Sequence, residues 1–235
     1  MGLWKNQMEN RNMILKHNAN IQISQLKVPG WAGNTTDNTC QPWHFKIFTD
    51  AASAGIELLY PYEDTTIPEV THPFIPVNDD WYLLEMDMSI STPDGTSLLV
   101  LPHYRFYTDT EWSTPITVAT MLETDWWPSL TILFKMPPKG YVTKFRKDEP
   151  FAQAIAVPRS SLKAEKMTDK EVEINQAAKL YTKKAVENLA TRQWVTSTGF
   201  VQDNLYEVMS HLYHQNKMPE DFPTFKKSKY RIIKT

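Results

Sequence analysis

The sequence predicts an α+β fold, in which a mainly antiparallel β sandwich or barrel of jelly-roll or β-clip type is followed by a C-terminal helical hairpin. Two observations predict the β part: the chain has 16 prolines against only 7 glycines, and six of its eight tryptophans lie between residues 31 and 127. Prolines end strands and aromatic side chains favour pleated surface, so together they indicate short strands joined by stiff loops. Apolar residues at helical spacing after residue 168 predict the α part.

Length, charge and cysteine content exclude several classes of protein. The 235 residues, 41% of them hydrophobic, are enough for one large domain or one domain with a helical appendage. A net charge of −2 excludes the strongly cationic surface that most nucleic-acid binders need, so no nucleic-acid partner is expected. No apolar stretch approaches the roughly 20 residues that cross a bilayer, and no signal peptide is recognisable, so we expect a cytoplasmic protein without a membrane partner. The single cysteine, Cys40, excludes a disulfide framework and is expected to be an ordinary thiol.

Charge also divides the chain. Residues 1–158 carry a net charge of −7 and residues 159–235 a net charge of +5. We therefore expect an extended N-terminal arm over residues 1–41, a β domain over 42–160, and an α-helical extension with a basic tail over 161–235. Opposite potentials steer association, so the acidic part is suited to dock on the basic part of its own or a neighbouring chain, with a solvated surface as the alternative.

Strands are expected where apolar and polar residues alternate and where proline, glycine or charge closes the segment. These segments are residues 21–28, 44–48, 55–60, 81–90, 97–101, 116–121, 130–134, 141–145 and 152–157. The tetrapeptide Thr92-Pro93-Asp94-Gly95 has the residues of a tight turn, which predicts a hairpin that folds 89–91 onto 97–101. A sandwich, a jelly roll and a β-clip all fit these strands.

Two helices are expected in the C-terminal part. Thr168 and Glu171 have the spacing of a capping box, so a helix should begin there. Its apolar stripe consists of Ile174, Ala178, Tyr181, Ala185 and Leu189, and fades near residue 194. After a break at 196–199, a second helix is expected over about 202–215, with its apolar side at Leu205, Val208, Met209 and Leu212. The basic run 226–231 is expected to be a solvated terminus.

Two groups of histidines are candidate metal ligands. Glu207, His211 and His214 share one face of the second helix, and carboxylate and imidazole at this spacing can ligate zinc or another divalent ion. His44, His72 and His103 lie on or beside predicted strands and could converge inside a barrel, but no pair of histidines two residues apart supports this. The alternative in both cases is that these are isolated polar side chains, and no cofactor is expected.

One acidic cluster is a candidate catalytic site. Glu123 and Asp125 follow an apolar strand and precede Trp126-Trp127. Carboxylates beside large aromatic side chains can have raised pKa values, so Asp125 or Glu123 could act as a general base. The alternative is that the tryptophan pair anchors a turn in the core.

Parts of the sequence resemble an uncharacterised family of β-rich proteins from bacteria and their phages, marine phages included. The resemblance spans about residues 42–160 and rests on the segments Gly55–Pro61, Thr92–Val100, Leu122–Trp126, Phe145–Ala152 and Val157–Arg159. It implies a β core and a viral or environmental source, with a bacterium or a phage-infected cell as the setting. It implies no activity.

The sequence also resembles, more faintly, the trimeric deoxyuridine triphosphatases of the β-clip fold. The segments Ser53–Leu58, Pro93–Gly95, Leu122–Trp126 and Lys147–Gln153 follow the order of that family's motifs, with Leu122–Trp126 at the place of the segment that carries the catalytic aspartate. The family's Arg-Ser-Gly phosphate motif and glycine-rich C-terminal arm have no counterpart here. The resemblance therefore implies a derived member that has lost the hydrolase chemistry.

From these observations we expect a non-catalytic binding or assembly module that forms homo-oligomers through aromatic-rich surface. The alternative is a small-molecule enzyme. It would be either a metal-dependent barrel that uses the histidines, or a nucleotide pyrophosphohydrolase that uses Asp125 or Glu123 as base with Mg2+. In the second case the candidate ligand-binding residues are Arg105, Arg146 and Trp126.

Overall fold

The computed structural model describes residues 14–19, 21–24, 41–67, 73–86, 88–107, 111–159, 166–189, 191–196 and 198–223. The chain divides into two compact units, each built from two separate stretches of sequence. The first unit comprises residues 1–27 and 52–161, and the second comprises residues 28–51 and 162–235. Residues 42–51, which the sequence assigns to the β domain, thus belong to the second unit.

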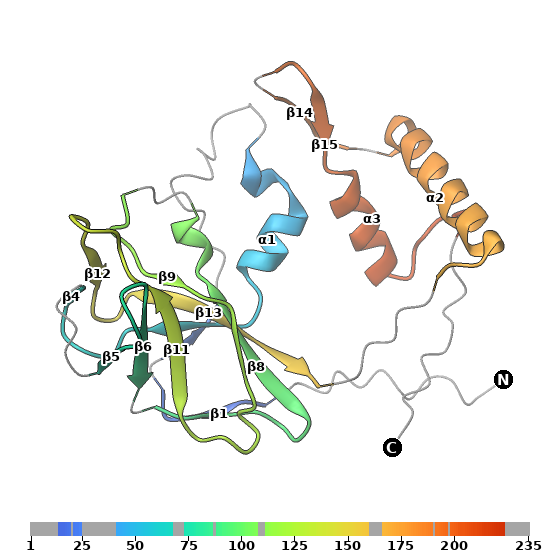
Figure 1. Ribbon diagram of the computed structural model, residues 1–235. Helices are drawn as coiled ribbons and strands as arrows, with labels where there is room; N and C mark the ends of the chain where they lie inside the picture. The colour runs from blue at the N-terminus through green and yellow to red at the C-terminus, as the bar shows by residue number, and fades with distance from the viewer. Residues whose placement is uncertain are drawn as a thin grey trace. The chain divides into compact units, whose positions relative to one another are not determined.

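The first unit is built from antiparallel sheets (Figure 1). Its largest sheet has five strands, which are in spatial order β10 (Thr120–Leu122), β8 (Thr96–Pro102), β13 (Pro150–Pro158), β3 (Ile56–Leu59) and β2 (Ile21–Ile23). A four-stranded sheet consists of β5 (Phe74–Pro76), β6 (Trp81–Met86), β11 (Leu130–Lys135) and β9 (Ile116–Thr117). Two short pairs complete the unit: β1 (Lys16–His17) with β7 (Ile90–Ser91), and β4 (Thr65–Ile67) with β12 (Thr143–Phe145). The expected α+β class with mainly antiparallel sheets is confirmed.

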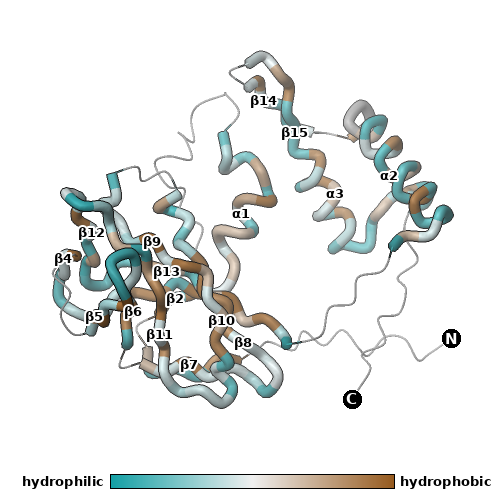
Figure 2. Tube along the Cα trace, in the orientation of Figure 1, coloured by the Kyte–Doolittle hydropathy of each residue, from teal (hydrophilic) through white to brown (hydrophobic). Residues whose placement is uncertain are grey.

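The core of the first unit is aromatic as well as aliphatic. Alternate residues of β6 and β11 are buried, as expected for strands with one face on a core. Figure 2 shows this apolar character along the strands of the first unit. Six buried rings pack against one another in the centre: Tyr60, Phe74, Tyr82, Phe134, Phe145 and Phe151. The tryptophan pair is not part of this core, since Trp126 is 65% exposed and Trp127 is 46% exposed.

The expected hairpin around Thr92–Gly95 is wrong, although the turn itself forms. Gly95 adopts a φ of 73°, and the Thr96 amide donates to the Pro93 carbonyl at 3.0 Å. The strands on either side of the turn do not pair with each other, because β7 pairs with β1 whereas β8 pairs with β10 and β13. The Thr92 backbone amide, just before the turn, donates to the Thr124 carbonyl in the loop after β10 rather than to a backbone carbonyl of β8.

The described residues of the second unit form three helices and a hairpin, which Figure 1 labels. In chain order its elements are the 3-10 turn η2 (Pro42–His44), α1 (Lys46–Ala52, whose last residue belongs to the first unit), α2 (Asp169–Asn188), β14 (Gln193–Val195), β15 (Val201–Asp203) and α3 (Leu205–His214). The expected strand over 44–48 is wrong. Pro42 begins a 3-10 turn, and Lys46 pairs with Asp50 at 2.6 Å across one turn of α1, a spacing that a helix favours.

The two C-terminal helices are confirmed. The Thr168 hydroxyl accepts from the Glu171 amide and the Glu171 carboxylate accepts from the Thr168 amide, which completes the expected capping box. The expected apolar stripe of α2 is its less exposed face, with Ala185 buried. Helix α2 ends at Asn188, and the hairpin β14–β15 that follows it was not expected. No helix among the described residues combines the length and hydropathy needed to cross a membrane.

Candidate functional site

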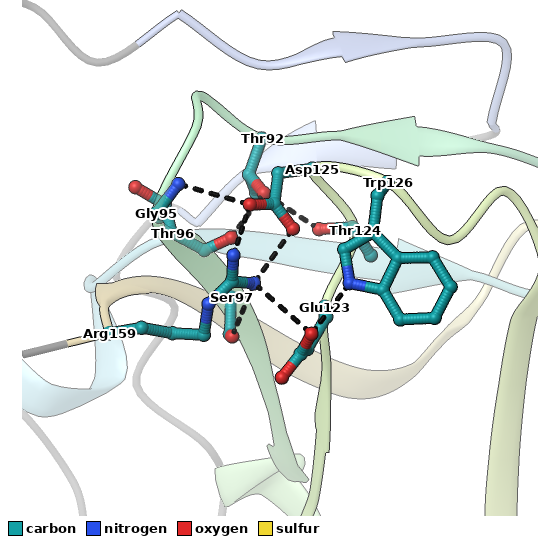
Figure 3. A network of polar contacts seen from close by, with 9 residues as sticks. All are labelled: Thr92, Gly95, Thr96, Ser97, Glu123, Thr124, Asp125, Trp126 and Arg159. Atoms are coloured by element: carbon teal, nitrogen blue, oxygen red, sulfur yellow. Dashed lines mark hydrogen bonds and ion pairs between the residues drawn. The ribbon is translucent and has the colours of Figure 1, made fainter.

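The acidic cluster lies in the first unit and holds three loops together (Figure 3). The Arg159 guanidinium donates to both carboxylate oxygens of Asp125, once at 2.7 Å. The Gly95 amide donates to the same carboxylate at 3.0 Å, and the Arg159 amide donates to the Gly95 carbonyl at 2.7 Å. These bonds join the Pro93–Gly95 turn, the loop after β10 and the end of β13.

The Asp125 carboxylate is therefore fully engaged. Hydrogen bonding to Arg159 holds its pKa below the usual range, opposite to the raised pKa that the sequence suggested. Glu123 accepts from the Trp126 indole at 2.5 Å and lies 3.8 Å from the Arg159 guanidinium. An arginine-bound carboxylate with a lowered pKa is a weak proton acceptor, so this arrangement is suited to holding loops together rather than to base catalysis.

Of the candidate ligand-binding residues, Trp126 joins this cluster through Glu123, whereas Arg146 and Arg105 do not. Arg146 lies 3.7 Å from Glu149 within its own turn. The Arg105 guanidinium lies over the Phe106 ring, 5.7 Å from its centroid. The cluster's arginine is Arg159, which ends the segment 157–159.

A second polar group of the first unit is buried inside the five-stranded sheet. Glu57 is 1% exposed and pairs in register with Gln22 and Gln153 on the neighbouring strands. The Gln22 side-chain nitrogen donates to the Glu57 carboxylate, and the His103 Nε2 atom lies 3.4 Å from its other oxygen. His103 Nδ1 accepts from the Arg105 amide at 3.3 Å, which places the ring proton on Nε2, facing the carboxylate. Burial lowers the pKa of His103 to about 4, so this imidazole is neutral near pH 7.

The second unit contains a cavity of about 240 Å³. Its aromatic lining comes from Trp43 and His44 in η2, from Trp194 in β14 and from His211 in α3. The His44 and Trp194 rings are stacked, with centroids 4.3 Å apart and planes 14° apart, and the Trp43 ring lies 4.0 Å from His44. His44 Nδ1 accepts from the Gln41 amide at 3.1 Å, so its proton is on Nε2. The cavity thus has an ordered aromatic wall.

The same cavity carries charged and polar groups. Lys46 and Thr49 come from α1, Arg192 from the residue before β14, and Glu207 from α3. Lys46 is paired with Asp50, whereas the Arg192 guanidinium forms no ion pair with any residue that the structure describes. The lining therefore offers an unpaired guanidinium beside the stacked rings.

Asn204 connects the residue before β14 with the first turn of α3 at this cavity. Its side-chain oxygen accepts from the Arg192 amide at 2.7 Å, and its side-chain nitrogen donates to Glu207 Oε2 at 2.9 Å. Its own amide donates to the Arg192 carbonyl at 3.2 Å. These bonds position the Glu207 carboxylate relative to the start of β14.

The structure brings together only some of the candidate metal ligands. His44, His211 and Glu207 line one cavity, whereas His214 is outside its lining and makes an edge contact with Tyr213. His103 belongs to the other unit, and His72 lies outside the described residues. Within the described ranges, no three His, Cys, Asp or Glu side chains are grouped as a metal site would need.

Sequence reasoning did not select Trp43, Lys46, Arg192 or Trp194. A signal for Trp194 was present, because aromatic and β-branched residues on both sides of the turn 196–199 are typical of a hairpin. No comparable signal marks Arg192. It lies at the cavity because of the tertiary fold, and it belongs to no sequence motif.

No protein-family model matches the sequence, and no curated protein sequence matches it. The structure is similar to the dUTPase of EIAV, with 15% identity and a TM-score of 0.37, over 66% of this chain and 98% of that one. It is also similar to the dUTPase of phage phi11 of S. aureus and to that of Staphylococcus bacteriophage 80alpha, each with 12% identity and a TM-score of 0.36 over 66% of this chain. The coverage of those two proteins is 97% and 89%. Likenesses this distant assign no function.

Proposed function

We propose that this chain is a non-catalytic binding module whose second unit binds a small, planar, anionic molecule. The observation that carries the proposal is that one cavity combines stacked aromatic rings with the Arg192 guanidinium, which forms no ion pair with the described part of the chain. Planar ligands stack on tryptophan and histidine faces, and a guanidinium binds carboxylate or phosphate through paired hydrogen bonds. The cavity's volume of about 240 Å³ is below the roughly 300–1,000 Å³ of drug-sized sites, which favours a ligand with one ring system.

The lining also favours an anion over a cation. Lys46 and Arg192 outnumber the single carboxylate, Glu207. Lys46 is shared with Asp50, so we assign the main anion contact to Arg192. A site with both aromatic and charged lining residues orients its ligand, with the ring against Trp194 and the anionic group at the arginine.

The alternative of a pyrophosphohydrolase centred on Asp125 receives no support from the geometry, because that carboxylate is bound by Arg159. Self-association through exposed aromatic side chains, with the acidic part of one copy facing the basic part of another, stays a proposal. Sedimentation equilibrium at low and high salt would test it, because an association driven by opposite charges weakens as salt increases.

Isothermal titration calorimetry with nucleoside monophosphates tests the proposed function, because each joins a planar ring to a phosphate. We expect these ligands to bind more tightly than either inorganic phosphate or the uncharged nucleosides. Arg192→Gln should weaken binding by about ten- to hundredfold, since hydrogen bonds to charged groups are worth about 1.5–3 kcal/mol. The control is Lys179→Gln on the exposed face of α2. Equal binding by both variants and the native chain would refute the assignment.

A further inference from the structure

The Glu207 carboxylate in the cavity is a hydrogen-bond acceptor that an anionic ligand group cannot satisfy. Glu207 is half-buried in the lining, and its Oε2 accepts from Asn204 at 2.9 Å. Among the described residues, no hydrogen bond or ion pair reaches its Oε1. An ionised carboxylate accepts only, and its two oxygens offer about four lone-pair positions. Most of that capacity is therefore open to the cavity's occupant.

A hydrogen bond from Asn204 fixes the orientation of the Glu207 carboxylate. Asn204 uses its oxygen for the Arg192 amide, so its amino group must face Glu207. The carboxylate is held at the first turn of α3, one helical turn before His211, which lines the same cavity. A carboxylate positioned in this way reads donors on its ligand with little loss of side-chain entropy.

We propose that Glu207 selects a ring whose edge carries adjacent N–H donors, so that the ligand is a guanine-type nucleotide. This inference rests on the proposed function, because it requires the ring to stack beside Trp194 with the phosphate at Arg192. Guanine presents two neighbouring N–H donors on one edge, which a carboxylate accepts with both oxygens. Adenine presents an acceptor at the corresponding ring position, and it would leave part of the carboxylate unsatisfied.

Competing occupants make different use of the same groups. An amino acid would place its ammonium at Glu207 and its carboxylate at Arg192, with no need for a planar edge. The parallel stack of His44 and Trp194 instead favours a flat, wide ring against the wall. We therefore use L-tryptophan as a competing probe.

The test compares the affinities of GMP, AMP, IMP and L-tryptophan for the native chain and for Glu207→Gln. We expect GMP to bind about tenfold or more tightly than AMP, as for other bidentate contacts between a side chain and a base, with IMP between them because it lacks one donor. The variant should abolish this preference and leave AMP binding within about twofold. His214→Gln on the same helix, outside the cavity, is the matched control.

The outcomes separate the two proposals. If the monophosphates bind and require Arg192, but GMP and AMP bind equally, the role of Glu207 is refuted and the proposed function stands. If L-tryptophan binds more tightly than GMP, the nucleotide is refuted as the ligand. If no monophosphate binds, both proposals fail. Circular dichroism of Glu207→Gln, whose glutamine can still accept from Asn204, shows whether a loss of binding comes from misfolding.

Discussion

The buried His103 predicts that the first unit loses stability in acid over a defined pH range. The His103 side chain is 1% exposed, and burial lowers its pKa from 6.5 to about 4 in the folded protein, against an opposing effect of Glu57. Between these two values the unfolded chain binds a proton that the folded chain lacks. The free energy of unfolding therefore falls as the pH falls from 6.5 to about 4, and this group has no effect above pH 6.5.

The magnitude follows from the shift in pKa. Each pKa unit corresponds to 1.36 kcal/mol, so the loss reaches about 3 kcal/mol near pH 4. Protonation also has a local consequence, because Nδ1 would then carry a proton and could no longer accept from the Arg105 amide. The 3-10 turn η3 (Tyr104–Phe106) would lose its N-terminal cap.

The variant His103→Asn isolates this effect. Its side-chain oxygen can still accept from the Arg105 amide, but it does not titrate. We would measure urea unfolding by circular dichroism at several pH values between 7.5 and 4. The difference in unfolding free energy between the native chain and the variant should change by about 3 kcal/mol across this range. The control Lys179→Gln, on the exposed face of α2 in the other unit, should follow the native curve. Parallel curves for native and His103→Asn would refute the reasoning.

Three further predictions concern stability in urea. Gly55→Ala should destabilise the protein by roughly 1–3 kcal/mol more than Gly95→Ala. Both glycines have a φ of 73°, but only at Gly55 would a Cβ overlap the backbone of β13. Equal losses of stability would contradict this. Tyr82→Phe should raise the free energy of unfolding by about 1 kcal/mol, since the buried Tyr82 hydroxyl has no partner among the described residues. Tyr60→Phe removes a hydrogen bond and should lower the free energy of unfolding. Changes of the same sign in the two variants would exclude this explanation. Trp126→Ala should change stability by less than about 0.5 kcal/mol, because the indole is 65% exposed; a loss typical of a core residue would show that it is buried in an assembly.

Local patterns predicted the elements whose causes are local. The capping box at Thr168 and the stripe through Ala185 needed only helical geometry, and the strand over 130–134 needed only alternation. The strand expected at 44–48 failed because five alternating residues are too few to outweigh a proline-initiated turn followed by an i, i+4 ion pair. The pairing expected across Thr92–Gly95 failed because the partners of β8 come from elsewhere in the chain.

The site was harder to predict for the same reason. The sequence identified Glu207 and His211 from their helical spacing, and the structure places them beside His44. The sequence alone could not predict their aromatic and basic neighbours. Trp43 and Arg192 are far apart in sequence, and only the tertiary fold brings them to the same cavity. The sequence proposed Asp125 as a general base with a raised pKa, whereas its arginine partner lowers that pKa.

Because each unit is built from two separate stretches of sequence, proteolytic cleavage between the units would divide the cavity's lining between two fragments. The cavity is lined by residues from 43–49 and from 192–211, and strands β3 to β13 lie between these two stretches in the sequence. A proteolytic nick after Arg159 would leave every described strand of the first unit on one fragment, together with half of the cavity wall. Neither fragment alone would carry a complete site. Ligand affinity should return only when both fragments are mixed, which makes reassembly of the cut protein measurable by titration.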